Sequence, residues 1–279
     1  MELTLDFLKE AWLISQADDD AAKRMWDLFA KTRANTHFPE FEKDFGLQML
    51  ASRGVLNALD GLDHKPHVLD LGCGAGVYSA WFAERGYAVT AADLSPFCLD
   101  KARKLADERG ITDIEFAQCD WHNFDIAEQG WINRFDLIFA NTTPAVQSYE
   151  TFRKMLDAGN GWYYMGKPVR RTDAVTDAIM ERAGITPVHR PFLLDMLYAY
   201  NLVVLEGGSP IVDWKTGYWH GEMDIESAKA YYPDWIATNH GLPKDKRSLI
   251  EAAIEQIAQN GVVIADDDVT IQYMIWQGQ

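Results

Sequence analysis

The feature that most constrains the fold is a short apolar run that ends in an acid and leads into three alternating glycines. It reads His67-Val-Leu-Asp-Leu-Gly-Cys-Gly-Ala-Gly-Val77. Its apolar part is typical of a buried strand, and residues 78–85 have the spacing of a helix. Glycines at such a strand-to-helix turn permit a tight backbone and the close approach of a ligand. The start of the following helix adds unpaired N–H groups.

Strands and helices alternate after this turn. Strands are predicted at residues 87–92, 114–118, 135–140 and 161–165, with helices at 96–109 and 148–158 between them. This alternation predicts a doubly wound, Rossmann-like α/β fold, with a mostly parallel sheet and helices on both faces. Two later strand candidates, at 210–223 and 262–276, bring the sheet to seven strands and are expected to form an antiparallel edge.

The segments around this alternating region differ in pattern. Residues 3–59 predict helices, of which the last covers 45–59 and ends near Gly61. We therefore divide the chain into an N-terminal helical cap at 1–60 and a Rossmann-like core at 61–279. Within the core, an aromatic-rich insertion is expected near 190–245. Further helices are predicted at 172–183, 191–205 and 249–258.

The composition argues against several classes of binding partner and cellular location. Acidic residues outnumber basic ones by 42 to 26, which gives a net charge of -16. Such a chain repels the phosphates of nucleic acids and the surface of anionic membranes. Three cysteines cannot form a disulfide framework, and their odd number suits a reducing compartment. With no signal-peptide pattern at the N-terminus and no apolar stretch long enough to span a bilayer, we expect a cytoplasmic protein.

The glycine loop departs from the dinucleotide-binding pattern. In that pattern the third small residue would be position 77, which is Val77, whereas the third glycine here is Gly76. In addition, Asp70 stands two residues before the first glycine, where a carboxylate would lie unfavourably near a pyrophosphate. An acid at this place suits a ligand with a cationic or N–H-bearing group.

The segment Val68-Leu-Asp-Leu-Gly-Cys-Gly-Ala-Gly76 resembles motif I of the class I S-adenosylmethionine-dependent methyltransferases, in their small-molecule type. Three further motifs follow in the family's order. They are Ala91-Ala-Asp-Leu-Ser95, Ala117-Gln-Cys-Asp-Trp121 and Phe135-Asp-Leu-Ile-Phe-Ala-Asn141. The resemblance covers roughly residues 60 to 170, and it implies a methyltransferase that uses S-adenosyl-L-methionine as cofactor.

The resemblance also implies roles for individual residues. The methionine half of the cofactor would contact Asp70 and the loop residues Gly72, Cys73, Gly74 and Gly76. The ribose hydroxyls would bind Asp93, beside Leu94, because one carboxylate offers two acceptor oxygens. The adenine would contact Asp120 and Trp121, and the methyl-transfer site would adjoin Asn141. Each residue also has a plainer explanation: a bare loop, a helix cap for Asp93, turn residues for Asp120 and Asn141, and a core position for Trp121.

Methyl transfer from a sulfonium mainly requires alignment and the exclusion of water. A hydroxyl or thiol acceptor also needs a general base, and our first candidate is His37, with Tyr149 and His122 as weaker ones. No metal is expected, because neither His64 with His67 nor His220 with Glu222 has further ligands at metal-binding spacing.

The chain is rich in aromatic residues, with 10 Trp, 11 Tyr and 13 Phe. Several lie outside the cofactor motifs, in segments expected to roof the pocket. They are Trp12, Trp26, Phe29, Phe38, Trp214, Tyr218 and Trp219. They predict a small, planar or apolar methyl acceptor.

Three alternative functions stay open. A non-catalytic protein that binds S-adenosylmethionine or S-adenosylhomocysteine would keep the same motifs. An NAD-dependent oxidoreductase is disfavoured by Val77 and Asp70. A nucleobase or glutamine methyltransferase is disfavoured because Asn141-Thr-Thr-Pro144 only partly matches the N-P-P-Y motif. No nucleic-acid or membrane partner is expected, and the sequence has no signal for oligomeric state.

Overall fold

The computed structural model of the protein describes residues 4–12, 24–28, 31, 39–186, 193–240 and 246–278. Its centre is a seven-stranded sheet with the order β3-β2-β1-β4-β5-β7-β6. The strands are β1 (His67–Leu71), β2 (Ala88–Asp93), β3 (Ile114–Gln118), β4 (Phe135–Asn141), β5 (Gly159–Arg171), β6 (Ile211–Asp224) and β7 (Val262–Gln277). Strands β1 to β5 are parallel, and β7 is antiparallel to both β5 and β6. The predicted doubly wound, mostly parallel sheet with an antiparallel edge is confirmed.

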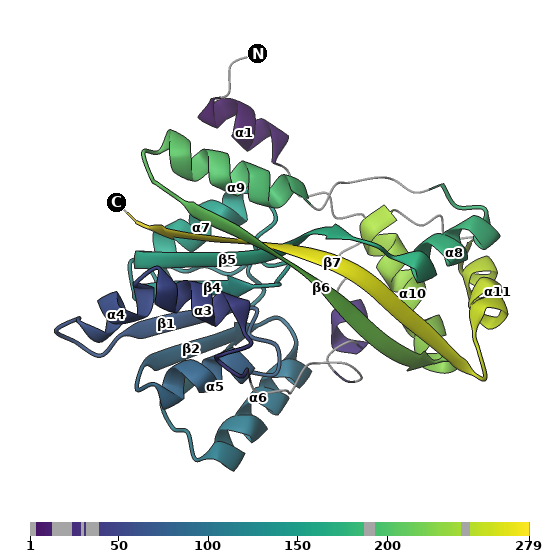
Figure 1. Ribbon diagram of the computed structural model, residues 1–279, viewed down its shortest axis with the longest axis horizontal. Helices are drawn as coiled ribbons and strands as arrows, with labels where there is room; N and C mark the ends of the chain where they lie inside the picture. The colour runs from purple at the N-terminus through teal and green to yellow at the C-terminus, as the bar shows by residue number, and fades with distance from the viewer. Residues whose placement is uncertain are drawn as a thin grey trace.

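Helices cover both faces of this sheet (Figure 1). They are α1 (Leu5–Ala11), α3 (Phe45–Ser52), α4 (Val55–Asp60), α5 (Val77–Glu84), α6 (Pro96–Arg109), α7 (Tyr149–Ala158), α8 (Ala174–Ala183), α9 (Leu193–Leu205), α10 (Ile225–His240) and α11 (Arg247–Ile257). Side chains of β4 alternate between the two faces, as the period of a strand requires. Ile138 belongs to a buried cluster with α1, α7 and α9, whereas Leu137 and Phe139 belong to one with α3, α4 and α5.

One helix prediction needs correction, and one helix was not predicted. The single helix expected at 45–59 is two helices, α3 and α4, because Gly54 has a φ of 77° and adopts the left-handed conformation between them. Helix α10 was not predicted, since Pro233 lies inside it and proline normally interrupts a helix. Burial of Tyr232, Trp235 and Ile236 on this helix supplies packing that the local pattern does not show.

Three strands continue beyond the edge at which β4 ends. Asn141, the last residue of β4, pairs with Gly166, while β5 runs on to Arg171. Strands β7 and β6 accompany this extension and pair as far as Val262 and Asp224. A separate buried cluster joins the extension to α8, α10 and α11. From here on, "the cap" means these three helices together with the strand ends, and not the N-terminal helices. Figure 1 shows the cap beyond the carboxyl edge of the parallel strands.

The N-terminal segment is divided between these two regions. Helices α1, α3 and α4 pack on the sheet itself, whereas Met25 is buried in the cluster of the cap. The division of the chain at residue 60 and the insertion near 190–245 stay predictions. Within the described ranges, no helix combines the length and apolar character that crossing a bilayer requires.

Candidate active site

The loop between β1 and α5 is built on its three glycines, which have φ values of 74°, 56° and 76° at Gly72, Gly74 and Gly76. A Cβ on Gly72 would lie 2.0 Å from Oγ1 of Thr143, and one on Gly76 would lie 2.5 Å from Cβ of Ala102. A Cβ on Gly74 would meet no atom within 4 Å. Gly72 and Gly76 therefore serve close packing, and Gly74 borders open space where a ligand can approach the backbone.

Asp93 at the end of β2 is oriented by two backbone donors. Its Oδ2 accepts a hydrogen bond from the N–H of Gly74 at 2.9 Å, and its Oδ1 accepts one from the N–H of Ser95 at 2.8 Å. Burial raises the pKa of this half-buried carboxyl, while the two backbone donors lower it. Each carboxylate oxygen keeps a further lone pair, so Asp93 can still accept hydrogen bonds from two hydroxyl groups.

Asp70 is a buried acid beside the same loop, with 3% of its surface exposed. Its Oδ2 accepts a hydrogen bond from Oγ of Ser79 at 2.5 Å. Burial raises the pKa of Asp70 to about 7, and the nearby charge of Asp93 contributes to the rise. No salt bridge joins Asp70 to a cation among the residues that the structure describes. A cationic ligand group would compensate this charge.

The other predicted cofactor residues follow on the neighbouring strands. Leu94 is half-buried next to Asp93, and Cys73 is buried within the loop. Asp120 is exposed after β3, and its carboxylate accepts hydrogen bonds from the N–H of His122 at 3.3 Å and from Nδ2 of Asn123 at 2.9 Å. Trp121 is buried beneath α7, where its Nε1 donates to the carbonyl of Thr151 at 3.0 Å.

Asn141 ends β4 at the carboxyl edge of the sheet, and its Oδ1 accepts a hydrogen bond from the hydroxyl of Tyr164 at 3.1 Å. The next residue, Thr142, has a φ of 52°, which is uncommon for a residue with a side chain, and its N–H donates to the carbonyl of Gly166 at 2.7 Å. The backbone therefore turns sharply beside the glycine loop, at the place where the sequence predicts the methyl-transfer site.

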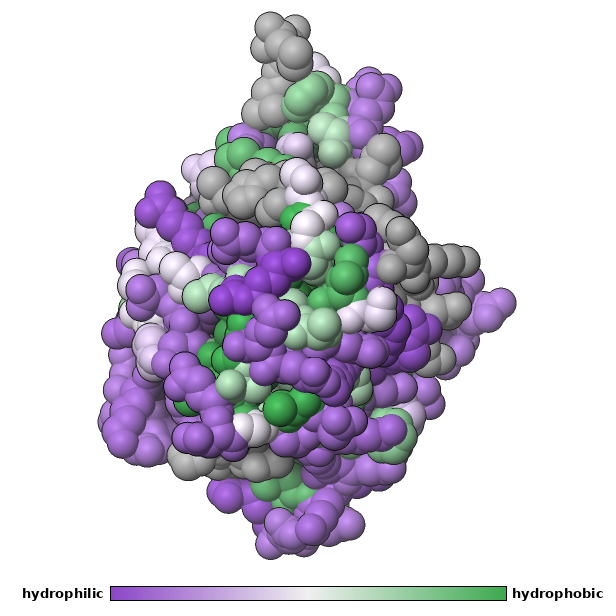
Figure 2. All heavy atoms as spheres, turned by 90° about the vertical axis from the view of Figure 1, so that its right-hand side faces the viewer, coloured by the Kyte–Doolittle hydropathy of each residue, from purple (hydrophilic) through white to green (hydrophobic). Residues whose placement is uncertain are grey.

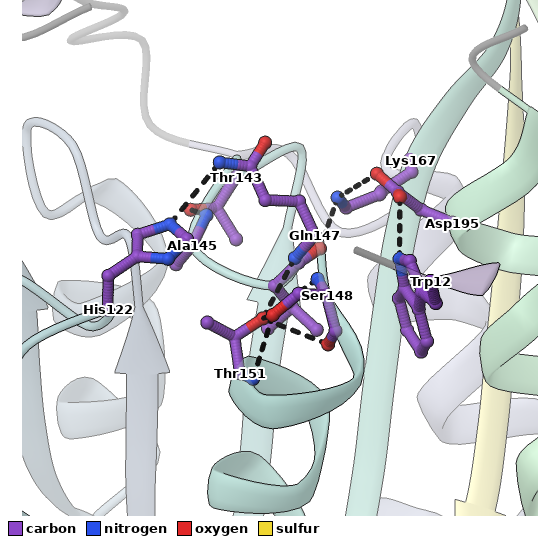
Figure 3. Close-up of polar contacts among 10 residues, drawn as sticks. Trp12, His122, Thr143, Ala145, Gln147, Ser148, Thr151, Lys167 and Asp195 are labelled. Atoms are coloured by element: carbon purple, nitrogen blue, oxygen red, sulfur yellow. Dashed lines mark hydrogen bonds and ion pairs between the residues drawn. The ribbon is translucent and has the colours of Figure 1, made fainter. Parts of the chain in front are cut away.

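The loop from β4 to α7 is held by its own polar side chains (Figure 3). Ser148 and Thr151 form a capping box that starts α7. Oγ1 of Thr143 accepts a hydrogen bond from the N–H of Ala145 at 3.1 Å. The side chain of Gln147 reaches Nε2 of His122 at 3.3 Å, so this loop contacts the chain that follows β3.

A buried ion pair that the sequence reasoning did not single out lies next to this loop (Figure 3). Nζ of Lys167 on β5 lies 2.9 Å from Oδ2 of Asp195 on α9, and it also donates to the carbonyl of Val146. Oδ1 of Asp195 accepts a hydrogen bond from Nε1 of Trp12 at 2.9 Å. The sequence does contain a signal for this pair, namely one charged residue in each of two largely apolar segments. Unpaired charges are costly to bury, so two such residues are expected to pair.

Asp27 is a second residue that the sequence reasoning missed. Its Oδ1 accepts a hydrogen bond from Oγ of Ser95 at 2.9 Å, and its charge contributes to raising the pKa of Asp93. Three residues earlier, the guanidinium of Arg24 donates to both carboxylate oxygens of Asp234 on α10, each at 3.0 Å. The short segment 24–28 therefore connects the predicted ribose site with the cap.

The aromatic residues expected to roof the pocket occupy different environments. Trp12 is fully buried, with its ring 5.4 Å from that of Phe152, so it belongs to the core. Trp214, Tyr218 and Trp219 lie on the extended part of β6 and are 55%, 59% and 37% exposed. Trp26 is half-buried against the cluster of the cap. Phe29, Phe38 and the predicted base His37 lie outside the described residues.

The described part of the chain has no group of three or more His, Cys, Asp or Glu side chains that could hold a metal ion. His64 instead contacts Asp63 and Asp136, each at 3.1 Å. His220 lies 2.7 Å from Asp266.

Comparison with known proteins identifies the region that contains this site. The model of a family described as "Methyltransferase domain" matches residues 62–178. The 2-heptyl-1-hydroxyquinolin-4(1H)-one methyltransferase of Mycobacteroides abscessus is 36% identical over 75 residues, which cover 27% of this chain and 31% of that protein. The malonyl-[acyl-carrier protein] O-methyltransferase of Salmonella typhimurium is 38% identical over 96 residues, 34% of this chain and 37% of that protein.

The chain thus spans about a third of the length of these curated relatives. Among solved structures, a putative sarcosine dimethylglycine methyltransferase from Galdieria sulphuraria is similar over 94% of this chain and 99% of that chain. Its TM-score is 0.47 and its sequence identity is 13%.

Proposed function

Because residues 62–178 of this chain belong to the class I S-adenosylmethionine-dependent methyltransferase family, we propose that the protein transfers a methyl group from S-adenosylmethionine to a small molecule. The observation that supports this most directly is the arrangement around Asp93. Its two oxygens are held by the N–H groups of Gly74 and Ser95, and the adjacent Gly74 borders open space. This arrangement suits a ribose with two hydroxyl donors.

When bound, S-adenosylmethionine supplies a methyl group that its sulfonium has already activated. The residues of the chain then bind the cofactor, orient it and exclude water. Asp93 orients the ribose, and Asp70 balances positive charge at the methionine end. Asn141 and the strained Thr142 border the path between the methyl group and its acceptor. Cap residues beyond the sheet edge limit the access of solvent.

We place the acceptor between this sheet edge and the cap, and we keep the proposal that it is planar or apolar. Trp219 supports this proposal, because it lies on the strand extension beyond the cofactor edge and 37% of its surface is exposed. Figure 2, which faces the cap end of the molecule, shows apolar side chains between hydrophilic ones. The net charge of -16 favours a small molecule over a nucleic acid. The three buried free thiols suit a cytoplasmic location.

Calorimetric titration with S-adenosylhomocysteine and with NAD tests the cofactor. We expect the protein to bind S-adenosylhomocysteine, and Asp93→Ala to weaken that binding by about 1.5–3 kcal/mol, the range for hydrogen bonds to a charged group. Asp100→Ala, on the exposed side of α6, is the matched control and should leave the affinity unchanged. Tight binding of NAD, or equal affinity in wild type and Asp93→Ala, would contradict the proposal.

Catalysis is tested by incubating the protein with labelled S-adenosylmethionine and a small-molecule extract. We expect label to appear in an extract component only when the protein is present. Cofactor binding without transfer to any fraction would instead favour the alternative function, a non-catalytic protein that binds S-adenosylmethionine or S-adenosylhomocysteine.

A further inference from the structure

A polar pair that the cofactor assignment does not use lies between α3 and α5. The hydroxyl of Tyr78, in the first turn of α5, donates a hydrogen bond to Oδ2 of Asp44 at 2.6 Å. Asp44 is the N-cap of α3, and its Oδ1 accepts a hydrogen bond from the N–H of Leu47 at 2.9 Å. Both Tyr78 and Asp44 are half-buried. We call these two residues the Asp44–Tyr78 pair.

The pair lies against the carboxyl edge of the central strands. The ring of Tyr78 is 5.0 Å from that of Phe139 on β4, which in turn stacks at 4.4 Å on Tyr164 of β5. The hydroxyl of Tyr164 bonds to Asn141, the residue at the predicted methyl-transfer site. On the other side, the charge of Asp70 contributes to raising the pKa of Tyr78, so the pair also lies within electrostatic range of the predicted methionine site.

The residues around the pair are tightly packed. A Cβ on Gly46, in the first turn of α3, would lie 2.3 Å from the hydroxyl oxygen of Tyr164. A Cβ on Gly166 would lie 2.6 Å from Oδ1 of Asn141. Helix α3 can therefore approach Tyr164 this closely only because position 46 is glycine, and this approach sets the position of Asp44 relative to the edge.

Hydrogen-bond accounting restricts what the pair can bind. A phenol has one proton, and Tyr78 donates it to Asp44, so its oxygen is left with acceptor capacity only. Burial and the charge of Asp44 raise the pKa of Tyr78, so the phenol keeps that proton. Asp44 is itself an acceptor and has no salt bridge within the described part of the chain. Both members therefore present oxygen lone pairs to a ligand.

We propose that the Asp44–Tyr78 pair is a subsite for a hydrogen-bond-donating ligand group, an ammonium or a hydroxyl, beside the methyl-transfer position. The inference rests on the proposed function, because only a bound cofactor places a methyl group there. A carboxylate or phosphate at this place would meet lone pairs and the negative charges of Asp44 and Asp70. Two molecules can supply the donor group: the methyl acceptor, or the cofactor through its amino-acid end.

The test uses Tyr78→Phe, which removes one hydroxyl and keeps the ring. Tyr87→Phe is a matched control, because the hydroxyl of Tyr87 also donates to a carboxylate, Asp60, at 2.6 Å. Tyr87 immediately precedes β2 and so lies at the opposite edge of the parallel strands. Asp44→Asn, which removes the charge and keeps the shape, is the second variant.

Calorimetry with two probes tests whether the cofactor supplies the donor group. S-adenosylhomocysteine has the amino-acid end, and 5′-methylthioadenosine lacks it. If the subsite binds the cofactor's ammonium, Tyr78→Phe and Asp44→Asn each weaken the binding of S-adenosylhomocysteine about tenfold or more, since the loss of a hydrogen bond to a charged group has an effect of that order. The affinity for 5′-methylthioadenosine stays unchanged. Equal losses for both probes would mean that the pair only supports the fold, and this result would overturn the proposal.

A second assay tests whether the methyl acceptor supplies the donor group. It measures methyl transfer to a small-molecule extract at saturating labelled S-adenosylmethionine. If the acceptor supplies that group, both variants require about tenfold more extract for the half-maximal rate, while binding of S-adenosylhomocysteine stays at the wild-type value. If both variants match Tyr87→Phe in every arm, the proposal is wrong. Failure of the proposed function is seen in the wild-type protein, which would then either not bind S-adenosylhomocysteine or bind it without transferring label to any fraction of the extract.

Discussion

Asp70 is the residue at which burial and charge conflict most clearly. It lies almost fully buried beside the glycine loop, and its main partner is the neutral hydroxyl of Ser79. Burial holds its pKa at about 7, so the carboxyl is half protonated near neutral pH. A group in this state responds strongly to a cationic ligand, because the cation favours the ionised form.

We therefore expect the affinity for S-adenosylmethionine to rise as the pH increases from 6 to 8. Below pH 7 the binding of a cation must first displace the proton of Asp70, whereas above pH 7 the carboxylate is already ionised. Titration calorimetry in two buffers with different heats of ionisation measures the protons released. Asp70→Asn should abolish both the pH dependence and the proton release. An unchanged pH profile in that variant would exclude Asp70 from contact with the cofactor.

The same pKa has the opposite consequence for the unliganded fold. The pKa of Asp70 is raised on folding from 3.8 to about 7, so its contribution to stability is complete below about pH 4 and is lost as the pH rises through 7. The free protein thus becomes less stable with rising pH over the range in which cofactor binding becomes stronger.

At the scale of elements, the Lys167–Asp195 pair joins segments that are distant in the sequence. It connects β5 with α9, with the β4–α7 loop through Val146, and with α1 through Trp12. Each of these elements also contributes to one buried cluster on the sheet. The pair therefore sets how α1 and α9 pack next to the loop that follows Asn141.

Lys167→Met should destabilise the protein by about 3–5 kcal/mol, because it removes one partner of a largely buried ion pair. Denaturant unfolding measures the loss. The double variant Lys167→Met with Asp195→Leu should recover much of the stability, since it removes both charges. Lys65→Met, which breaks an exposed pair with Asp113, is the control and should have little effect. A loss for Lys167→Met no larger than that for Lys65→Met would contradict this account.

At the scale of the whole molecule, the protein has a core sheet and a cap with its own buried cluster. The β5–β7–β6 extension carries the cap, and the segment 24–28 forms a second connection to it. Arg24 reaches Asp234 of the cap, and Asp27 reaches Ser95 beside the predicted ribose site. Because one short segment contacts both regions, the position of the cap and the binding of the cofactor are expected to influence each other.

Asp27→Ala should weaken S-adenosylhomocysteine binding by about 0.5–1.5 kcal/mol, since it removes one hydrogen bond that orders Ser95 and, through its N–H, Asp93. Calorimetry measures the change. Asp6→Ala, in the first turn of α1, is the control. The combination of Asp27→Ala with Ser95→Ala should cost little more than either change alone, because both remove the same bond. Additive losses would show that the two residues act separately.

Elements bounded by strong local signals were predictable from the sequence. Strand β1 lies in the apolar run that starts at His67, as predicted, because a charged and proline-containing segment precedes it and glycines follow it. Helix α6 has its predicted limits, since Pro96 begins it and Gly110 ends it in the left-handed conformation. Helix α10 was missed because its local sequence contains Pro233, and packing within the cap outweighs that signal.

The sequence by itself determined the order of strands and helices, the glycine loop and the acids at the strand ends. These depend on the local periodicity of side chains and on the conformational freedom of glycine, both of which can be read along the chain. Only the tertiary structure decided which distant residues meet. It brought Asp44 to Tyr78, Asp27 to Ser95, and Asp195 to both Trp12 and Lys167. Such contacts depend on how the sheet and helices pack in three dimensions, and no spacing in the sequence specifies them.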